Sequence, residues 1–234
     1  MALPCTSGAT CVAMITLIAI SRQLDAELDQ YDQHIRDFAV EKSPLDASHR
    51  FTLLDECTLE GLLSRIWQSW SNFCRRCIIE SCLGTTNGTG AVIPGLPDAL
   101  TEAHVSGAAV RSYRKPNQPC WGDVNTVLRS EPTWGDVDVL VKILTRLRPN
   151  NVSQLLAAFS SGHASAKALQ LIRNGAAHHN IQTFSEIQVL QSSYVVFSIA
   201  HPIHAMFWTE PRTQDFLVTQ AIQELKDTAL AAIS

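Results

Sequence analysis

The chain has 234 residues, of which 46% are hydrophobic and 17% are charged, with 11 glycines and 10 prolines. A chain of this length and composition buries a sizeable core, which excludes a disordered protein, a collagen-like repeat and a disulfide-stapled mini-protein. The formal net charge is −4, so the whole surface is not basic as it is in general nucleic-acid coat proteins.

An apolar run over residues 11–20 lies near the start of the sequence. Its ten residues are too few for a bilayer, which takes about twenty. The first positive residue, Arg22, follows the run, whereas a signal peptide places its positive charge before the apolar stretch. We therefore expect the run to be the buried start of a helix in a cytoplasmic protein without a membrane segment.

The seven cysteines are odd in number, which fits a reducing compartment better than a disulfide framework. Cys74 and Cys77 have the CxxC spacing of a metal site, but no second pair completes four ligands. They fall in a strongly helical stretch, so we interpret them as small packed residues. No metal or other cofactor is expected.

Apolar residues at helical spacing predict a long helix over 11–42, which Ser43 and Pro44 end. A second helix is predicted over 53–83, and the short connection indicates an antiparallel pair. Residues 84–95 contain four glycines and a proline, which predicts a loop.

Six further helices follow, and no segment alternates convincingly with the period of a strand, so the predicted fold class is all-α. The predicted ranges are 98–112, 137–147, 151–160, 163–178, 184–200 and 213–232. The residues expected to cap helices are Asp123, Asp136, Asn151, Ser185 and Thr213.

The most informative stretch is 171–180, Leu-Ile-Arg-Asn-Gly-Ala-Ala-His-His-Asn, which closes the predicted helix 163–178. On a straight helix Arg173 and His178 diverge by about 140°, whereas Asn174 and His178 share a face. A site that uses both Arg173 and His178 is therefore expected where two copies of this helix cross.

These residue types suit chemistry at a phosphate. An arginine fork matches a phosphate or phosphorane, and a histidine transfers protons to or from a 2′-hydroxyl or a leaving oxygen. Gly175, Ala176 and Ala177 would let two such backbones approach closely. A structural interpretation also stands, in which residues 178–180 cap the helix and Arg173 satisfies carbonyls at its end.

The stretch Arg173–His178 resembles the R-[polar]-x3-H signature of the HEPN superfamily, and Leu-Ile-Arg-Asn-x-x-Ala-His is similar to its RNase and toxin branch. Residues 60–75 look like the long upstream helix of RiboL-PSP-like HEPN proteins, and the segment from Thr213 looks like their terminal helix. The resemblance is specific over 171–180 and looser over 52–232. Gly175 and Ala176 stand where the family often has bulky residues.

The resemblance implies a HEPN-like helical bundle over 51–234 that forms a homodimer across the motif helices. Residues 1–50 would add a long N-terminal helix that packs on or extends this bundle. The family includes metal-independent endoribonucleases of toxin–antitoxin and phage-defence systems, so RNA is the implied substrate. An antitoxin or another defence-system protein is a candidate partner.

Carried over by position, Arg173 would contact the scissile phosphate, His178 would act as acid or base, and Asn174 would orient the pair. His179 lies one step beyond the signature and is a candidate support residue. Glu60 and Arg65, on the helix over 53–83, either line the RNA cleft or form its wet edge.

His201 and His204 flank Pro202, and no acidic or cysteine residue lies close to them in the sequence. A metal site is one interpretation of this pair. We favour the surface of a kinked helix.

Three functions follow from the sequence. The leading hypothesis is a metal-independent RNase that acts as a toxin or defence effector. The alternative is a non-catalytic HEPN-like module that binds a nucleotide or a partner protein. A helical adaptor without a site would leave the Arg-Asn…His pattern as coincidence.

The net charge divides into −7 for residues 25–60 and +5 for residues 65–173. The basic segment is expected to supply a local phosphate-binding cleft, and the acidic one to limit nonspecific RNA binding or meet a basic partner.

Overall fold

Helices form almost all of the regular structure in the computed structural model, which describes residues 15–46, 49–122, 130–178 and 180–234. A short antiparallel hairpin lies in the connection between α2 and α3. The prediction of an all-α fold is confirmed, because the hairpin pairs only two residues on each side. The elements are α1 (Leu17–Lys42), α2 (Leu53–Leu83), β1 (Thr85–Thr86), β2 (Val92–Ile93), α3 (Glu102–Arg114), α4 (Val137–Leu147), α5 (Val152–Ser161), α6 (His163–Ala177), α7 (Ile181–Gln188), the 3₁₀ helices η2 (Val189–Ser193) and η3 (Pro202–Phe207), and α8 (Leu217–Ile233).

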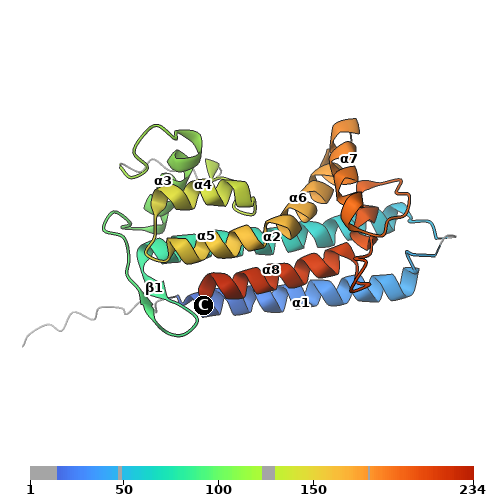
Figure 1. Ribbon diagram of the computed structural model, residues 1–234, viewed down its shortest axis with the longest axis horizontal. Helices are drawn as coiled ribbons and strands as arrows, with labels where there is room; N and C mark the ends of the chain where they lie inside the picture. Colours follow the sequence, from blue (N-terminus) through green and yellow to red (C-terminus); the bar gives the residue numbers. More distant parts are fainter. Residues whose placement is uncertain (1–14, 47–48, 123–129, 179) are drawn as a thin grey trace, which may run out of the picture.

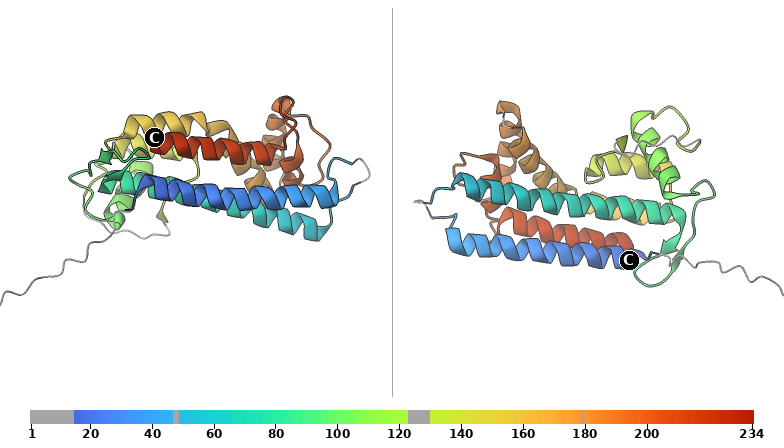
Figure 2. Two further views of the ribbon diagram at one scale, coloured as in Figure 1. Left: turned by 90° about the horizontal axis from the view of Figure 1, so that it is seen from below. Right: turned by 180° about the vertical axis from the view of Figure 1, so that it is seen from behind.

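The long helices α1, α2 and α8 lie side by side along the longest dimension of the molecule (Figure 1 and Figure 2). α1 and α2 are antiparallel, as the sequence predicted, and α5 and α6 pack against α8. α3 and α4 form one raised end of the molecule, and α7 projects at the other. The largest fully buried side chains include Trp70, Phe159, Phe207 and Trp208.

Local signals explain the ends of the two long helices. α1 begins at Leu17, because the Thr16 side chain accepts a hydrogen bond from the Ala19 N–H. Residues 15 and 16, which the prediction included in the helix, are not helical, and residues 11–14 lie outside the described part. α2 has the predicted bounds: Thr52 and Asp55 form a capping box at its start, and Gly84, with φ of 101°, follows its end.

The middle of the chain follows its predicted helices closely. α4 has the predicted bounds, and Asp136 caps it as expected by accepting from the Asp138 and Val139 N–H groups. Asp123, the other aspartate expected to cap a helix, lies outside the described residues. Asn151 holds the N-cap position of α5, but its side chain makes no capping hydrogen bond and instead donates to Ser81. The ends of α5 and α6 fall within one residue of prediction, while α3 begins four residues late.

The predicted helix over 184–200 is wrong. Asn180 begins α7 earlier through a capping box with Thr183, so Ser185 is not the cap. After η2 the chain becomes extended, and Val195 pairs with Thr209 in an isolated bridge. The last helix likewise begins after Phe216 rather than Thr213.

Cys74 and Cys77 lie inside α2 with no exposed surface, which agrees with their interpretation as packed residues. Within the described ranges, no group of three or more His, Cys, Asp or Glu residues is arranged to hold a metal ion. No helix in those ranges combines the length and apolarity needed to cross a membrane.

Candidate functional site

α6 carries the motif at its C-terminal end. The helix buries Ala168, Leu169 and Ile172, while Arg173 and Asn174 are partly exposed. The Arg173 Nη1 atom donates to Asn174 Oδ1 over 3.4 Å. The neighbouring amide therefore contacts the guanidinium group, and no other hydrogen bond from this group is seen among the described residues.

His178 ends the helix rather than continuing it. It is the C-cap of α6, with φ of −129° and ψ of 60°, so the angle of 140° expected for a straight helix does not apply to it. Its N–H donates to Asn174 O over 2.8 Å, and its carbonyl oxygen accepts from Asn180 Nδ2 and Thr183 Oγ1 over 2.7 and 2.8 Å. The backbone is held on both sides.

The imidazole of His178 is exposed. Within the described part of the chain no hydrogen bond or ion pair engages this ring, and none joins it to Arg173. His179 lies outside the described residues. One protein chain thus presents an arginine with an orienting amide and an exposed histidine without bringing the two side chains into contact.

Gly175 is buried within the chain. A Cβ atom at this position would lie 2.6 Å from Ile187 Cδ1 and 3.1 Å from Pro202 Cβ, so glycine allows α6 to approach α7 and η3 closely. The expectation that Gly175 serves an approach between two copies is therefore wrong. Ala177 is exposed, so a close approach of two copies at Ala177 stays a prediction.

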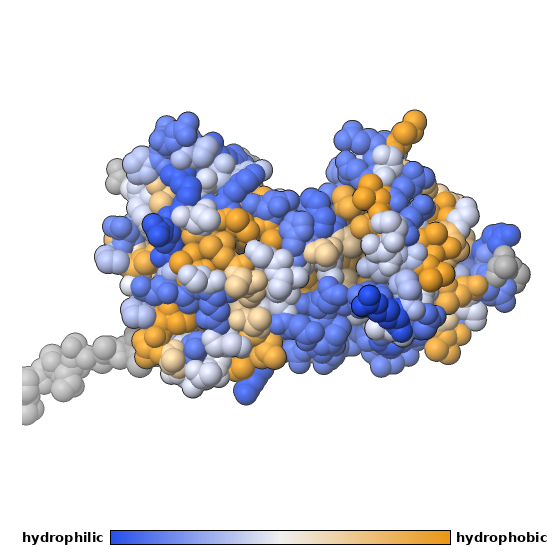
Figure 3. All heavy atoms as spheres, in the orientation of Figure 1, coloured by the Kyte–Doolittle hydropathy of each residue, from blue (hydrophilic) through white to orange (hydrophobic). Residues whose placement is uncertain are grey.

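The turn that contains His178 joins α6 to α7, which projects at one end of the molecule (Figure 1). Figure 3 shows a hollow in the surface between the end formed by α3 and α4 and the end formed by α7, and α6 rises beside it (Figure 1). Ile181, at the start of α7, is 90% exposed. A cavity of about 420 Å³ lies along α7 and is lined by Asn180, Ile181, Phe184, Ser185 and Gln188.

The two support residues on α2 have different environments. Glu60 lies with its Oε1 atom 3.5 Å from His201 Nε2, whereas the side chain of Arg65 is exposed. Glu60 thus belongs to a contact between α2 and the start of η3. Pro202, the next residue, connects this contact to Gly175 on the motif helix.

His204 is buried, so the interpretation of His201 and His204 as the surface of a kinked helix is wrong for His204. It is 5% exposed, stacks on Phe51 with ring centroids 4.0 Å apart, and places Nε2 3.0 Å from Glu56 Oε1. Burial lowers the pKa of His204, although the adjacent Glu56 carboxylate acts in the opposite direction.

Sequence reasoning missed this network because Glu56 lies 148 residues before His204. A usable signal exists nevertheless. Glu56 and Glu60 are spaced to share a helix face, and His201 and His204 are spaced for one turn of a 3₁₀ helix.

Part of the basic charge in residues 65–173 serves the fold. Arg75 forms two hydrogen bonds with the Glu131 carboxylate, over 2.7 and 2.8 Å. Arg111 donates to the carbonyl oxygens of Cys120 and Gly122, and Arg146 donates to that of Lys115. These arginines stabilise local structure, so the cleft predicted from segment charge has fewer available cations than the count suggested.

Comparisons of this chain with family models, curated proteins and solved structures gave no significant match. The resemblance to HEPN proteins therefore rests on the residues of the sequence itself, chiefly 171–180.

Proposed function

We propose that the protein is a metal-independent endoribonuclease of HEPN type that acts as a toxin or phage-defence effector. The observation that carries the proposal is the end of α6, where the His178 backbone is fixed on both sides and its imidazole is exposed, one turn from an Arg173–Asn174 pair. Fixed geometry with accessible functional groups is what acid–base chemistry on a bound phosphodiester requires.

The reaction is attack of a ribose 2′-oxygen on the adjacent phosphorus. The 2′-oxygen loses its proton, the bond from phosphorus to the 5′-oxygen breaks, and that oxygen gains a proton. The products are a 2′,3′-cyclic phosphate and a 5′-hydroxyl. Arg173 stabilises the charge on the phosphorane oxygens, and His178 transfers one of the two protons.

In the proposed homodimer, Arg173 and His178 of different protomers come together in one site. Arg173 and His178 make no direct side-chain contact in the described structure, so the site is proposed to take the arginine of one protomer and the histidine of its partner. The exposed Ile181 and Ala177 lie next to His178 and are available for such an interface.

The first test is cleavage of RNA in the presence of EDTA. Wild-type protein is expected to release fragments with 2′,3′-cyclic phosphate ends, while Arg173→Ala and His178→Ala remove cleavage. The matched controls are Arg114→Ala and His34→Ala, which change exposed residues of the same types on α3 and α1. Equal cleavage by wild type and both site variants, or none by wild type across varied RNAs, contradicts the proposal.

Mixing the two inactive variants tests the composite site. A heterodimer of Arg173→Ala and His178→Ala retains one arginine from one protomer and one histidine from the other. If the site forms between protomers, unfolding and refolding the mixture restores part of the activity. If both residues must come from the same chain, the mixture stays inactive although each variant still forms dimers.

One observation favours the alternative of a non-catalytic binding module. A cavity of about 640 Å³ lies between the α1–α2 connection and residues 197–200, and its lining includes His49, Phe51, Glu56 and Phe197. Its mixed polar and aromatic lining suits a nucleotide-sized ligand. Calorimetric binding of a mononucleotide that is lost in Phe197→Ala, together with absent RNA cleavage, would establish this function instead.

A further inference from the structure

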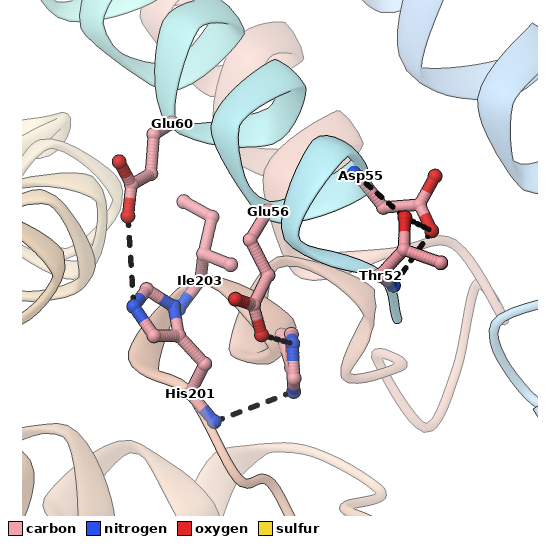
Figure 4. A network of polar contacts seen from close by, with 7 residues as sticks. Thr52, Asp55, Glu56, Glu60, His201 and Ile203 are labelled. Atoms are coloured by element: carbon pink, nitrogen blue, oxygen red, sulfur yellow. Dashed lines mark hydrogen bonds and ion pairs between the residues drawn. The ribbon is translucent and has the colours of Figure 1, made fainter. Parts of the chain in front are cut away.

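Two carboxylate–histidine pairs join the start of α2 to η3. Glu56 and Glu60 lie one helical turn apart on α2, and each faces one imidazole, with Glu56 Oε1 3.0 Å from His204 Nε2 and Glu60 Oε1 3.5 Å from His201 Nε2 (Figure 4). Both histidines belong to the start of η3, where His201 is the N-cap residue and His204 is the third residue of the helix. This arrangement fixes which nitrogen faces α2 in each ring.

The other nitrogen of each ring accepts a backbone hydrogen bond. Nδ1 of His201 accepts from the Ile203 N–H over 3.3 Å, and Nδ1 of His204 accepts from the His201 N–H over 3.4 Å. An amide N–H only donates, so both Nδ1 atoms must lack a proton. Each ring is therefore a neutral imidazole whose single proton lies on Nε2, facing a carboxylate.

The two rings thereby form a reciprocal cap at the start of η3. Uptake of a proton from solvent at Nδ1 turns this acceptor into a donor and breaks the hydrogen bond from the amide. Among the described residues, Glu56 on α2, His49 and the His201 ring act on His204, and Glu60 on α2 faces His201. Asp46 and Arg50 line the same cavity as His204. At His204, burial opposes the protonated ring, as do the charges of His201 and His49, whereas the Glu56 carboxylate favours it.

The cap is connected to the motif helix through Pro202. This residue lies directly after His201, and a Cβ on Gly175 would come within 3.1 Å of Pro202 Cβ. α6 and η3 are thus in close contact two residues from Arg173 and three from His178. A change at the start of η3 is transmitted to the last turn of α6 because close-packed elements have little room to adjust independently.

We propose that His201 and His204 are positioning residues: in their neutral form they hold the first turn of η3 against α6, and their protonation releases the end of α6 that carries Arg173 and His178. The inference rests on the proposed function for its catalytic consequence. It predicts a protein that loses order at the motif in mild acid while its helical bundle remains folded.

The test compares two substitutions of His201 over pH 5–8. His201→Asn keeps a side-chain acceptor for the Ile203 N–H, since asparagine is a good N-cap, but it does not titrate. His201→Ala removes the acceptor at every pH. His34→Asn, at an exposed position on α1, is the matched control. The readouts are amide hydrogen-exchange protection at His178 and Ile203, circular dichroism for the whole fold, and the rate of RNA cleavage.

In wild type, protection of the His178 and Ile203 amides is expected to fall on acidification while the rings take up protons, by up to about tenfold per pH unit for each ring, and then to level off, with unchanged circular dichroism. His201→Asn should reduce this pH dependence at the Ile203 amide, and His201→Ala should show low protection there throughout. In the cleavage assay the acid limb of the pH profile should shift between wild type and His201→Asn, and His34→Asn should behave as wild type.

Protection that is independent of pH in wild type, or equally dependent on pH in His201→Asn, overturns the inference. Absence of RNA cleavage at every pH contradicts the proposed function alone, because hydrogen exchange still measures the release of η3 and α6.

Discussion

Two glycines on neighbouring parts of the bundle have opposite surroundings. Gly162, between α5 and α6, packs so closely on α8 that a Cβ atom there would overlap the Thr228 side chain. Gly61, inside α2, has no heavy atom from outside its own stretch of helix backbone within 4 Å of the position that a Cβ would take. At Gly162 the absence of a side chain permits a contact between helices, whereas at Gly61 it only leaves the helix backbone more flexible.

Gly162→Ala is expected to lower the free energy of unfolding by about 1–3 kcal/mol, because the added methyl group forces α6 away from α8. Gly61→Ala, the matched control, is expected to raise it by about 0.5–1 kcal/mol through helix propensity. Urea denaturation followed by circular dichroism measures both. A neutral or stabilising result for Gly162→Ala would show that Thr228 moves aside without cost.

At the scale of elements, an ion-pair network joins α2, α3 and the segment before α4. Glu131 accepts from Arg75, Ser106 and Trp134, and Arg75 also contacts Glu102 over 2.8 Å. Burial by itself would raise the pKa of Glu131, but the hydrogen bonds and the Arg75 charge lower it overall. The network therefore stabilises the fold only while Glu131 is ionised.

Glu131→Gln is expected to cost about 1–3 kcal/mol, because it removes the charged acceptor from a partly buried pair while Arg75 keeps Glu102. Glu102→Gln removes a charge from the same arginine at a mostly exposed site and should cost about 0–1 kcal/mol. A cost for Glu131→Gln no larger than that for Glu102→Gln in urea denaturation would contradict the role of the buried network.

The pH dependence of the network has a definite sign. A carboxyl group whose pKa is lowered by folding contributes stability above its ordinary value of 4.5 and loses it as the pH falls through the folded-state pKa. The difference in stability between wild type and Glu131→Gln should therefore shrink below about pH 4.5. A constant difference down to pH 3 would show that ionisation of Glu131 does not matter.

Two helices with local capping signals have the bounds that the sequence predicted, although α7, which also begins with a capping box, does not. Thr52 with Asp55, and Asp136, fix helix starts through side chains within three residues, so α2 and α4 have the predicted bounds. The segment after Gln188 was predicted wrongly because its structure depends on a distant partner, the pairing of Val195 with Thr209. Apolar spacing alone does not distinguish such a segment from a helix.

The same distinction holds for the candidate site. The motif of Arg173, Asn174 and His178 could be recognised in the sequence because its residues lie close together in the chain. Its catalytic role stays a prediction. The contact between Glu60 and His201, and the burial of Gly175 against Pro202, arise only when α2, α6 and η3 come together. Charge counting also failed to anticipate that Arg75 pairs with Glu131.

At the scale of the whole molecule, three buried cysteines in α2 report on the integrity of the core. Cys74, Cys77 and Cys82 are fully buried, and burial raises the pKa of Cys77 and Cys82 to about 12. Cys57, near the start of the same helix, is exposed. Because the thiolate is the reactive form, the three buried groups are doubly protected from alkylation.

Iodoacetamide at pH 8 is expected to modify Cys57 in the native protein and to reach the three buried cysteines only at urea concentrations where the bundle unfolds. Mass spectrometry of peptides identifies the modified sites, and Cys57→Ser should remove the fast modification at position 57 without changing that of Cys74, Cys77 and Cys82. Modification of Cys74, Cys77 or Cys82 while circular dichroism remains native would show that α2 opens locally.

The contact between α1 and α8 has a consequence for biosynthesis. The two helices are neighbours in space, yet about 190 residues separate the end of α1 from the end of α8. At a synthesis rate of about 5–20 residues per second, the apolar stripe of α1 waits roughly 10–40 s on the ribosome for the helix that covers it. During that interval α2 or chaperones must cover the apolar residues of α1. These include Leu24, Leu28 and Ile35, which are all buried in the finished protein.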